Sequence, residues 1–403
     1  MEASVRADAL VEALLASMTA SGSLRSPRVA DAFRAVRRHT FVPGVGLEQA
    51  YRDEVVPVKM LDGRLVSSCS QPSIVACMLE QLELAPGMRV LEVGAGTGWN
   101  AALLGWLVGP TGSVVTIDID DDLVTAAQAH LAAAGSDNVL VVSGDGRKGF
   151  AAGAPFDRIV LTVGASDLAG PWWDQLQTGG RMVLPLSLRG IQRSIAFDER
   201  EGMLASTSIH DCAFMRLRGG PEGDGEQVVT CGPLTVTIDR AIDASSLRGL
   251  ISRPAEVTSL ALPASAEECF GGIALWLALH DPDYCGIDID WAPADGAPIM
   301  MAAEFRSGRR ILGWSPALYS GEALALLGRE GRGLVINTYG GAADLVDRLV
   351  ARLGEWHLSG RPNSSSLVVH GYRRPALPPP SDSAILLERD TTTFAIHWPA
   401  DAQ

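Results

Sequence analysis

The chain lacks any apolar run that approaches the roughly 18–20 residues of a membrane-spanning helix. Its start, Met1-Glu-Ala-Ser-Val-Arg6, has no basic segment followed by an apolar core, so we expect no secretion signal and a cytoplasmic protein. Basic residues are scarce, since 33 Lys and Arg stand against 47 Asp and Glu and give a net charge of −14. We therefore expect neither a nucleic-acid nor a membrane partner, because binding phosphate needs a basic surface.

Cysteine is sparse and shows no metal-binding spacing. No two cysteines form a Cys-x-x-Cys, and no close His pair accompanies them. We expect reduced, mostly buried thiols and no metal site. The six positions are Cys69, Cys77, Cys212, Cys231, Cys269 and Cys285.

The length of 403 residues exceeds what one hydrophobic core usually holds, so two or three domains are expected. Amphipathic patterns predict helices over 4–20 and 27–38. From residue 73 strands alternate with helices, which predicts a mostly parallel sheet covered on both faces. This rhythm is lost near residue 200. We expect a helical segment at 1–60, an α/β domain at 61–200, and a separate mixed α/β domain at 201–403 that could recognise a substrate.

Individual elements follow from the same patterns. Residues 50–72 look mixed and loop-like, with Asp62-Gly63 as a turn signal. The expected strands of the α/β domain are 88–93, 113–118, 139–143, 156–162, 181–186 and 191–198. In the last domain we expect strands at 233–238, 333–338, 367–372 and 384–397, and helices at 321–328 and 341–356.

The most informative segment is Val90-Leu-Glu-Val-Gly-Ala-Gly-Thr-Gly98. It predicts a buried strand that runs into a glycine-rich turn and then a helix, where the backbone passes close to a ligand. Glu92 precedes the first glycine by two residues. This acidic-x-Gly-x-Gly-x-Gly order is typical of S-adenosylmethionine loops, whereas dinucleotide loops more often read Gly-x-Gly-x-x-Gly. The segment therefore predicts a methyltransferase with a Rossmann-like domain, with an NAD enzyme as the alternative.

Two further carboxylates follow the next strands in register. Asp118 ends the second strand, where it can accept both ribose hydroxyls, and Asp145 in Gly144-Asp-Gly146 is placed to accept from the adenine amino group. Taken singly, Asp118 could instead cap a helix and Asp145 could be a turn residue. We expect the cofactor S-adenosylmethionine to be bound by Glu92, Gly94, Gly96, Thr97, Gly98, Asp118, Asp145 and Gly146.

From about residue 30 to 200 the chain resembles protein-L-isoaspartate O-methyltransferases. The matching pieces are Arg38-His-Thr-Phe-Val-Pro43, Ala50-Tyr-Arg-Asp53, Leu91–Trp99, Gly144-Asp-Gly146, Ala154-Pro-Phe-Asp157 and Gln175–Pro185. The repair enzymes of this family carry Thr-Ile-Ser-Ala-Pro-His where the substrate carboxylate binds. Here the aligned run is Ser68-Cys-Ser-Gln-Pro-Ser73, so hydroxyls remain at Ser68 and Ser70 while the histidine is replaced by Ser73.

This departure and the long C-terminal extension resemble a branch found with ribosomal peptide natural products such as lanthipeptides, graspetides and lasso peptides. The resemblance implies methylation of an ordinary aspartate in a modified, macrocyclic precursor peptide, followed by closure to an aspartimide. Ser68 and Ser70 are the expected catalytic residues, and the expected substrate contacts are Ser67, Cys69, Gln71 and Ser73.

Other interpretations stay open at this point. The serine run could simply cap a helix that begins near Ser73. Phe214-Met-Arg-Leu-Arg-Gly219 could line a groove for an acidic peptide or form a surface strand. For the whole protein the alternatives are broad isoaspartyl repair, which the lost histidine weakens, and a binding module without catalysis, against which the complete cofactor set argues. Oligomeric state is not predicted.

Overall fold

The computed structural model describes residues 2–61, 64–219, 227–231, 234–240, 242–251, 255–291, 301–307, 310–379 and 383–399. Its main sheet has the strand order β19-β20-β18-β9-β8-β7-β6-β3-β4-β5. The strands from β7 to β5 run parallel, and those from β8 to β19 are antiparallel to their neighbours. The parallel strands are β3 (Arg89–Val93), β4 (Ser113–Asp118), β5 (Val139–Ser143), β6 (Phe156–Leu161) and β7 (Leu176–Leu188). This strand order and parallel pairing confirm the predicted Rossmann-like fold.

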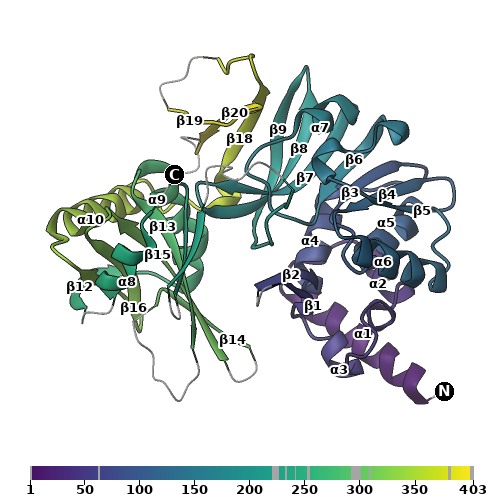
Figure 1. Cartoon of the computed structure of the whole chain (residues 1–403), viewed down its shortest axis with the longest axis horizontal. Helices are drawn as coiled ribbons and strands as arrows, with labels where there is room; N and C mark the ends of the chain where they lie inside the picture. Colours follow the sequence, from purple (N-terminus) through teal and green to yellow (C-terminus); the bar gives the residue numbers. More distant parts are fainter. Residues whose placement is uncertain are drawn as a thin grey trace.

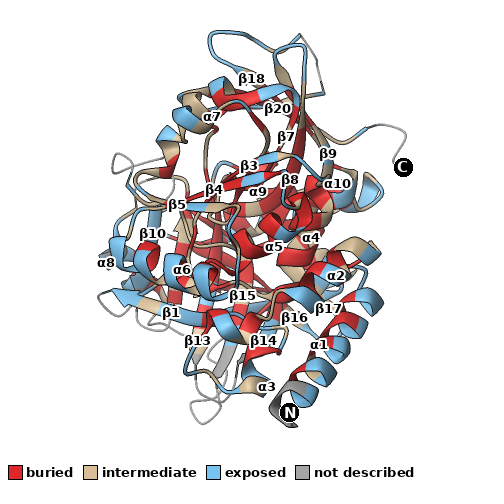
Figure 2. Cartoon of the chain, turned by 90° about the vertical axis from the view of Figure 1, so that its right-hand side faces the viewer, coloured by how far each residue is buried: buried red, intermediate tan, exposed pale blue. Residues whose placement is uncertain are grey.

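Helices of the N-terminal half cover one face of this sheet (Figure 1). The second helix begins as predicted, because the Ser26 side chain accepts from the Val29 amide and Pro27 occupies the first turn. Buried residues dominate α4 and α5 where they meet the sheet (Figure 2). The helices are α1 (Glu2–Ala20), α2 (Pro27–Ala35), α3 (Leu47–Ala50), α4 (Pro72–Leu82), α5 (Trp99–Val108) and α6 (Asp121–Ala133), with a short α7 (Gly170–Gln175).

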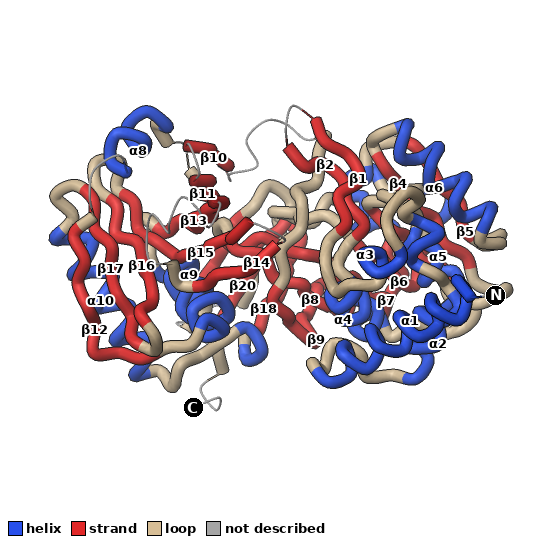
Figure 3. The backbone as a smooth tube through the Cα atoms, turned by 90° about the horizontal axis from the view of Figure 1, so that it is seen from below, coloured by secondary structure: helices blue, strands red, loops and turns tan. Residues whose placement is uncertain are grey.

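The C-terminal half builds a second sheet, with the order β10-β11-β13-β15-β16-β17-β12 and β14 on β15. Every strand pair assigned in this sheet is antiparallel. Figure 3 shows these strands at one end of the molecule and the N-terminal helices at the other. The strands are β10 (Gln227–Cys231), β11 (Leu234–Ile238), β12 (Glu256–Pro263), β13 (Tyr284–Trp291), β14 (Ala303–Ser307), β15 (Arg310–Tyr319), β16 (Leu324–Glu330) and β17 (Gly333–Tyr339). The helices are α8 (Ala244–Ile251), the π-helical η4 (Glu268–Ile273), α9 (Ala274–His280) and α10 (Ala343–Leu358).

One hydrophobic cluster contains residues of both halves. Neighbouring residues of a strand point to opposite faces of a sheet. Val90 accordingly packs with the N-terminal helices, whereas Leu91 belongs to a cluster that includes residues of α9 and α10. Helix α9 of the C-terminal half therefore packs on β7 and β8 from the face opposite the N-terminal helices, and α7 contributes Trp172 to the same cluster.

The chain also returns to the first sheet at its end. Strands β18 (Val368–Arg373), β20 (Thr392–His397) and β19 (Ile385–Glu388) extend the edge formed by β9 (Met203–Asp211), which follows β8 (Ile191–Arg200). Buried Arg193 lies at this junction, where its Nε donates to Ser364 Oγ at 2.7 Å and lies 3.0 Å from Asp211 Oδ1. The predicted division at residue 200 remains a prediction, but hydrogen-bonded strands cross it.

Three segments differ from expectation. Residues 384–397, predicted as one strand, form the two antiparallel strands β19 and β20. Residues 321–328, predicted as a helix, contain the start of β16, whose first five residues are buried. A short, uniformly apolar run does not distinguish a buried strand from a buried helix, and here β15 and β17 pair with it on both sides. Residues 50–72, predicted as loop-like, contain the hairpin β1 (Val56–Leu61) and β2 (Arg64–Cys69). The turn signal Asp62-Gly63 lies outside the described residues.

Candidate functional site

The glycine loop joins β3 to α5 and needs its glycines. Gly94, Gly96 and Gly98 have φ angles of +105°, +51° and +85°, which side chains disfavour. A Cβ at Gly94 would lie 2.6 Å from Thr162 Oγ1. The amides of Gly94 and Ala95 donate to the carbonyl of Ile117 at 2.8 and 3.1 Å. The loop is thus fixed against the end of β4 and presents its backbone to the cavity beside it.

Glu92 lies on β3, just before the loop, and supports the loop from the protein interior. It is fully buried and accepts from Thr116 Oγ1 at 2.6 Å and from Asn100 Nδ2 at 2.7 Å. Burial raises the pKa of Glu92 to about 7, although both hydrogen bonds favour the ionised form. This carboxyl group joins the first turn of α5 to β4.

Asp118 lies at the end of β4, as predicted, and borders the cavity. Its Oδ2 accepts from the Gly96 amide at 2.9 Å and its Oδ1 from the Asp120 amide at 3.2 Å. Each carboxylate oxygen has two lone pairs, so one acceptor position per oxygen remains. That capacity fits the pair of ribose hydroxyls.

The third predicted carboxylate has other partners. Asp145 caps a 3-10 turn (η2, Gly146–Lys148) by accepting from the Arg147 amide at 3.0 Å, and it forms an ion pair with the Arg147 side chain. It is not among the residues that line the cavity, whereas Gly146 is. A Cβ at Gly146 would lie 2.3 Å from Val93 Cγ1, so this position needs glycine. The contact of Asp145 with adenine stays a prediction.

Thr97 is also internally bonded. Its carbonyl oxygen accepts from His130 Nδ1 at 2.9 Å, and its Oγ1 accepts from the Trp99 amide at 3.4 Å. Gly98 is the N-cap residue of α5, and a Cβ there would lie 3.3 Å from Ala127. These two residues therefore position the helix that follows the loop.

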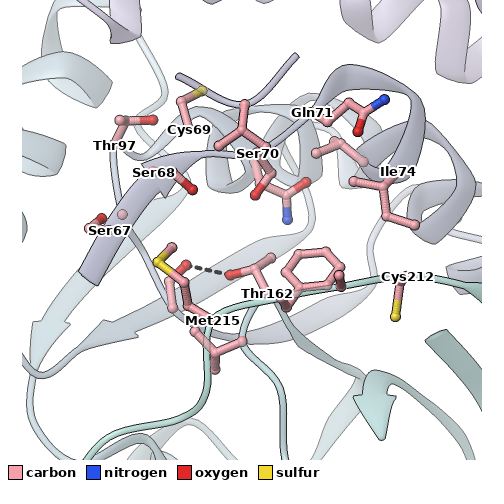
Figure 4. Close-up of a pocket in the computed structure, with 18 of the residues that line it drawn as sticks. Ser67, Ser68, Cys69, Ser70, Gln71, Ile74, Thr97, Thr162, Cys212 and Met215 are labelled. Carbon is pink, nitrogen blue, oxygen red and sulfur yellow. Dashed lines mark hydrogen bonds between the residues drawn. The ribbon is translucent and has the colours of Figure 1, made fainter. Parts of the chain in front are cut away.

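The serine run forms the facing wall. It spans the end of β2 and the start of α4. The residues of this run that line the cavity bordered by the glycine loop are Ser67, Ser68, Cys69, Ser70, Gln71 and Ser73. A Cβ at Gly96 would lie 3.6 Å from the carbonyl oxygen of Ser68. Figure 4 shows Ser68 and Ser70 on one side of the cavity and Thr162 and Met215 on the other. The fold thus brings together the two motifs that the sequence singled out.

The serine hydroxyls do not cap the helix. The N-cap residue of α4 is Gln71, without a side-chain cap, and Asp53 accepts from the Ser73 amide at 2.8 Å and from Gln71 Nε2 at 3.1 Å. Among the residues that the structure describes, the hydroxyls of Ser68 and Ser70 make no hydrogen bond. They are donors available to a ligand.

Arg38, which the sequence analysis used only as part of the family resemblance, supports the serine run from the protein interior. Its buried guanidinium donates to Cys69 O at 3.2 Å and to Ser70 O at 2.9 Å. It also donates to the carbonyls of Ala50, Arg52 and Glu54, and it lies 5.1 Å from the centre of the Trp99 ring. One side chain thereby fixes the serine run to segment 50–54 and to the start of α5.

A segment of residues 212–218 closes the cavity on the side facing the serines. Gly164, after β6, donates to Met215 O and accepts from the Leu217 amide, both at 2.8 Å. The Gln192 side chain forms two hydrogen bonds with the backbone of Phe214, at 2.7 and 3.1 Å. Arg218 pairs with Asp120, which also lies 3.3 Å from Lys59 Nζ of β1. The segment is therefore a cavity wall, as one of its two predicted roles requires.

The cavity has a volume of about 900 Å³. This lies at the upper end of the roughly 300–1,000 Å³ range of small-molecule sites, which leaves room for a cofactor and an acceptor side chain. Sequence reasoning missed Thr162, Asp53 and Gln192, whose partners lie 18 or more residues away in sequence. It also missed Asn100, which binds Glu92 from eight residues away. With its glycine cradle and the acceptor capacity of Asp118, the site fits S-adenosylmethionine.

Comparison with known proteins agrees with this chemistry. The profile of the protein-L-isoaspartate(D-aspartate) O-methyltransferase family matches residues 9–222. A protein-L-isoaspartate O-methyltransferase of Hyperthermus butylicus is 38% identical over 215 residues, which cover 51% of this chain and 87% of the relative. That of Methanopyrus kandleri is 39% identical over 210 residues, covering 52% and 91%.

Solved structures with the same name resemble it more loosely. One protein-L-isoaspartate O-methyltransferase covers 89% of this chain and 96% of its own at 23% identity, with a TM-score of 0.49. Another, from Plasmodium falciparum in complex with S-adenosyl-L-homocysteine, covers 51% and 97% at 20% identity, with a TM-score of 0.45. None of the helices formed by the described residues combines the length and apolar character needed to cross a membrane. The chain belongs to the protein-L-isoaspartate(D-aspartate) O-methyltransferase family and is an S-adenosylmethionine-dependent carboxyl O-methyltransferase.

Proposed function

We propose that this enzyme methylates the side-chain carboxylate of an ordinary aspartate in a modified, macrocyclic precursor peptide, and that the ester then closes to an aspartimide. The observation that carries the proposal is the serine run of the cavity wall, which has Ser73 where the repair enzymes have a histidine. The run keeps hydroxyls at Ser68 and Ser70, and these make no hydrogen bonds to other described residues. The serine run and the C-terminal extension resemble the peptide-modifying branch of the family.

The first step needs orientation more than acid–base catalysis. An aspartate with a pKa near 4 is already ionised at pH 7, so no general base is required. S-adenosylmethionine, when bound, supplies the methyl group on a sulfonium. Ser68 and Ser70 donate to one carboxylate oxygen and leave the other free to attack. A neutral hydroxyl stabilises the ground-state carboxylate less than an arginine would, so the nucleophile stays reactive.

The covering segment supports the same step. Residues 212–218 border the cavity opposite the serines, and Gly164 and Gln192 hold their backbone. A fixed cover excludes water from the reacting carboxylate. Gln192 and Gly164 act through this segment and are positioning residues.

The second step is an intramolecular reaction of the methyl ester. The backbone nitrogen after the aspartate attacks the ester carbonyl, a C–N bond forms, and the C–O bond to the methoxy group breaks. The amide proton leaves with methoxide as methanol. Methoxide departs far more readily than oxide would from a carboxylate, so we assign no catalytic residue to this closure. We place both steps in the cytoplasm, where the five described free thiols would remain reduced.

Isoaspartyl repair is the second candidate. It is favoured by the match to the family profile over residues 9–222 and by relatives that carry the repair enzymes' name at 38–39% identity. The two candidates differ in the acceptor, because repair requires the carboxylate of an isomerised aspartate, whatever the surrounding peptide.

Two matched macrocyclic peptides separate the candidates. They share one sequence and carry either aspartate or isoaspartate at the same position, and each is incubated with the enzyme and S-adenosylmethionine. We expect mass spectrometry to show a methyl ester and then the dehydrated aspartimide from the aspartyl peptide. Turnover of the isoaspartyl peptide alone would establish repair and contradict the proposal. Binding of S-adenosylmethionine without turnover of either peptide would favour a binding module.

A further inference from the structure

Four large apolar side chains surround the cavity and stay partly exposed. The exposed fractions are 47% for Val55, 36% for Leu65, 39% for Ile119 and 39% for Leu312. All four line the cavity that contains the serine run and the glycine loop. Exposed apolar side chains that gather around one opening mark a contact site, whereas single scattered ones do not. We call these four residues the apolar rim.

The apolar rim is assembled from distant parts of the chain. Val55 precedes β1, Leu65 is on β2, and Ile119 follows the last residue of β4. Leu312 comes from β15 of the C-terminal sheet, outside the 9–222 region matched by the family profile. The C-terminal half therefore contributes a side chain to the opening of the methyltransferase cavity.

We propose that the apolar rim binds apolar side chains that flank the target aspartate of the peptide substrate. This inference rests on the proposed function and adds a sequence preference to it. Leu65 and Ser68 are three residues apart on one extended strand, which corresponds to about 10 Å. An extended substrate spans the same distance in three residues. Positions three apart on a strand start from opposite faces, but Leu65 and Ser68 both line the cavity. An apolar residue two or three positions from an aspartate held by Ser68 is therefore within reach of Leu65.

A peptide suits the apolar rim better than a second copy of this chain. Its four residues line a cavity rather than a flat face, so only a narrow chain that enters the cavity contacts all of them. The substrate backbone must also approach this opening if its aspartate is to reach Ser68 and Ser70. Flanking side chains that leave water here are stabilised, because apolar burial is favourable.

The test uses macrocyclic aspartyl peptides of one design, with leucine or serine at the positions two and three residues from the aspartate. For the native enzyme we expect about tenfold higher kcat/KM with the leucine peptides, mainly through KM. Leu65→Ser and Leu312→Ser should each reduce this preference severalfold and leave the affinity for S-adenosyl-L-homocysteine unchanged. Val257→Ser is the matched control, since Val257 is 50% exposed on β12 and does not line the cavity.

The possible results distinguish a failure of the apolar rim from a failure of the proposed function. Equal methylation of leucine and serine peptides overturns the apolar rim but leaves the proposed function standing. A preference that Leu312→Ser does not alter excludes the contribution of the C-terminal half and overturns the inference as stated. If neither aspartyl peptide is methylated while S-adenosyl-L-homocysteine binds, the proposed function fails and the inference fails with it. A dimer in light scattering that Leu312→Ser converts to a monomer, with an unchanged preference, assigns the apolar rim to a second copy.

Discussion

The two walls of the cavity differ in how many of their polar groups already have partners. On the glycine-loop side, which we call the cofactor wall, Asp118 and Thr97 line the cavity and Glu92 is buried behind them. Each of the three makes at least two hydrogen bonds within the protein. On the serine side, Ser68 and Ser70 lack such bonds to the described residues. Polar groups whose hydrogen bonds are already formed in the free protein have a fixed geometry. This preorganisation suits a cofactor that is the same in every reaction, because less conformational entropy is lost when it binds. Hydroxyls without partners suit a reacting group, because their bonds form only when the acceptor arrives.

The largest effect should come from the residue that holds the serine wall. Arg38→Met removes donors from five carbonyl groups, two of them in the serine run. Unsatisfied buried acceptors are costly, so we expect the free energy of unfolding to fall by about 4 kcal/mol in urea denaturation. The control is Arg52→Met, an exposed arginine of the same segment. Equal losses in the two variants would show that Arg38 is not the support described.

Glu92 makes the stability of the folded protein depend on pH. Its folded-state pKa of about 7 exceeds the ordinary value of 4.5, so its contribution to stability is complete below pH 4.5 and is lost as the pH rises to about 7. Glu92→Gln removes this titration. Relative to the native enzyme, the variant should gain about 3 kcal/mol of stability between pH 4.5 and pH 8. Denaturation at several pH values measures the gain, and a difference that does not vary with pH would contradict it.

Asp118 tests whether the cofactor wall recognises its ligand through a carboxylate. Asp118→Asn keeps one acceptor for the Gly96 amide but loses the charge and one oxygen that would face the ribose. We expect the Kd for S-adenosyl-L-homocysteine to rise about 50-fold in calorimetry. Asp122→Asn, at an exposed carboxylate in the first turn of α6, should leave it nearly unchanged. Similar Kd values for the two variants would remove Asp118 from the site.

The sequence predicted the methyltransferase sheet well because local signals agreed with each other. Apolar runs of strand length ended in Gly94 or Asp118, and caps such as Ser26 marked the helices. The antiparallel sheet was harder, because its pairing depends on residues far apart in the chain. Nothing local in Leu324–Leu327 indicates that β15 and β17 will pair with it, and nothing in Val368–Arg373 indicates a return to β9.

The sequence predicted the glycine loop and the serine run of the site, but not the residues that hold the cavity walls in place. The glycine loop and the serine run are local motifs, so their residues could be chosen directly. Arg38 and Gln192 bind backbone carbonyls and amides of segments 12–32 and 22 residues away, and a backbone group carries no residue-specific signal. For Asp145 the motif suggested a role in binding adenine, but nothing in it indicated that the Arg147 side chain pairs with this carboxylate.

The most direct test of the account replaces both unpartnered hydroxyls. For the Ser68→Ala, Ser70→Ala double variant we expect kcat/KM for an aspartyl peptide to fall about 20-fold. The Kd for S-adenosyl-L-homocysteine should stay within about twofold, since the cofactor wall does not depend on these hydroxyls. A double Ser→Thr variant, which keeps both hydroxyls, should restore most of the activity. Unchanged kcat/KM, or a loss explained entirely by weaker cofactor binding, would contradict the claim that the serine wall holds the methyl acceptor.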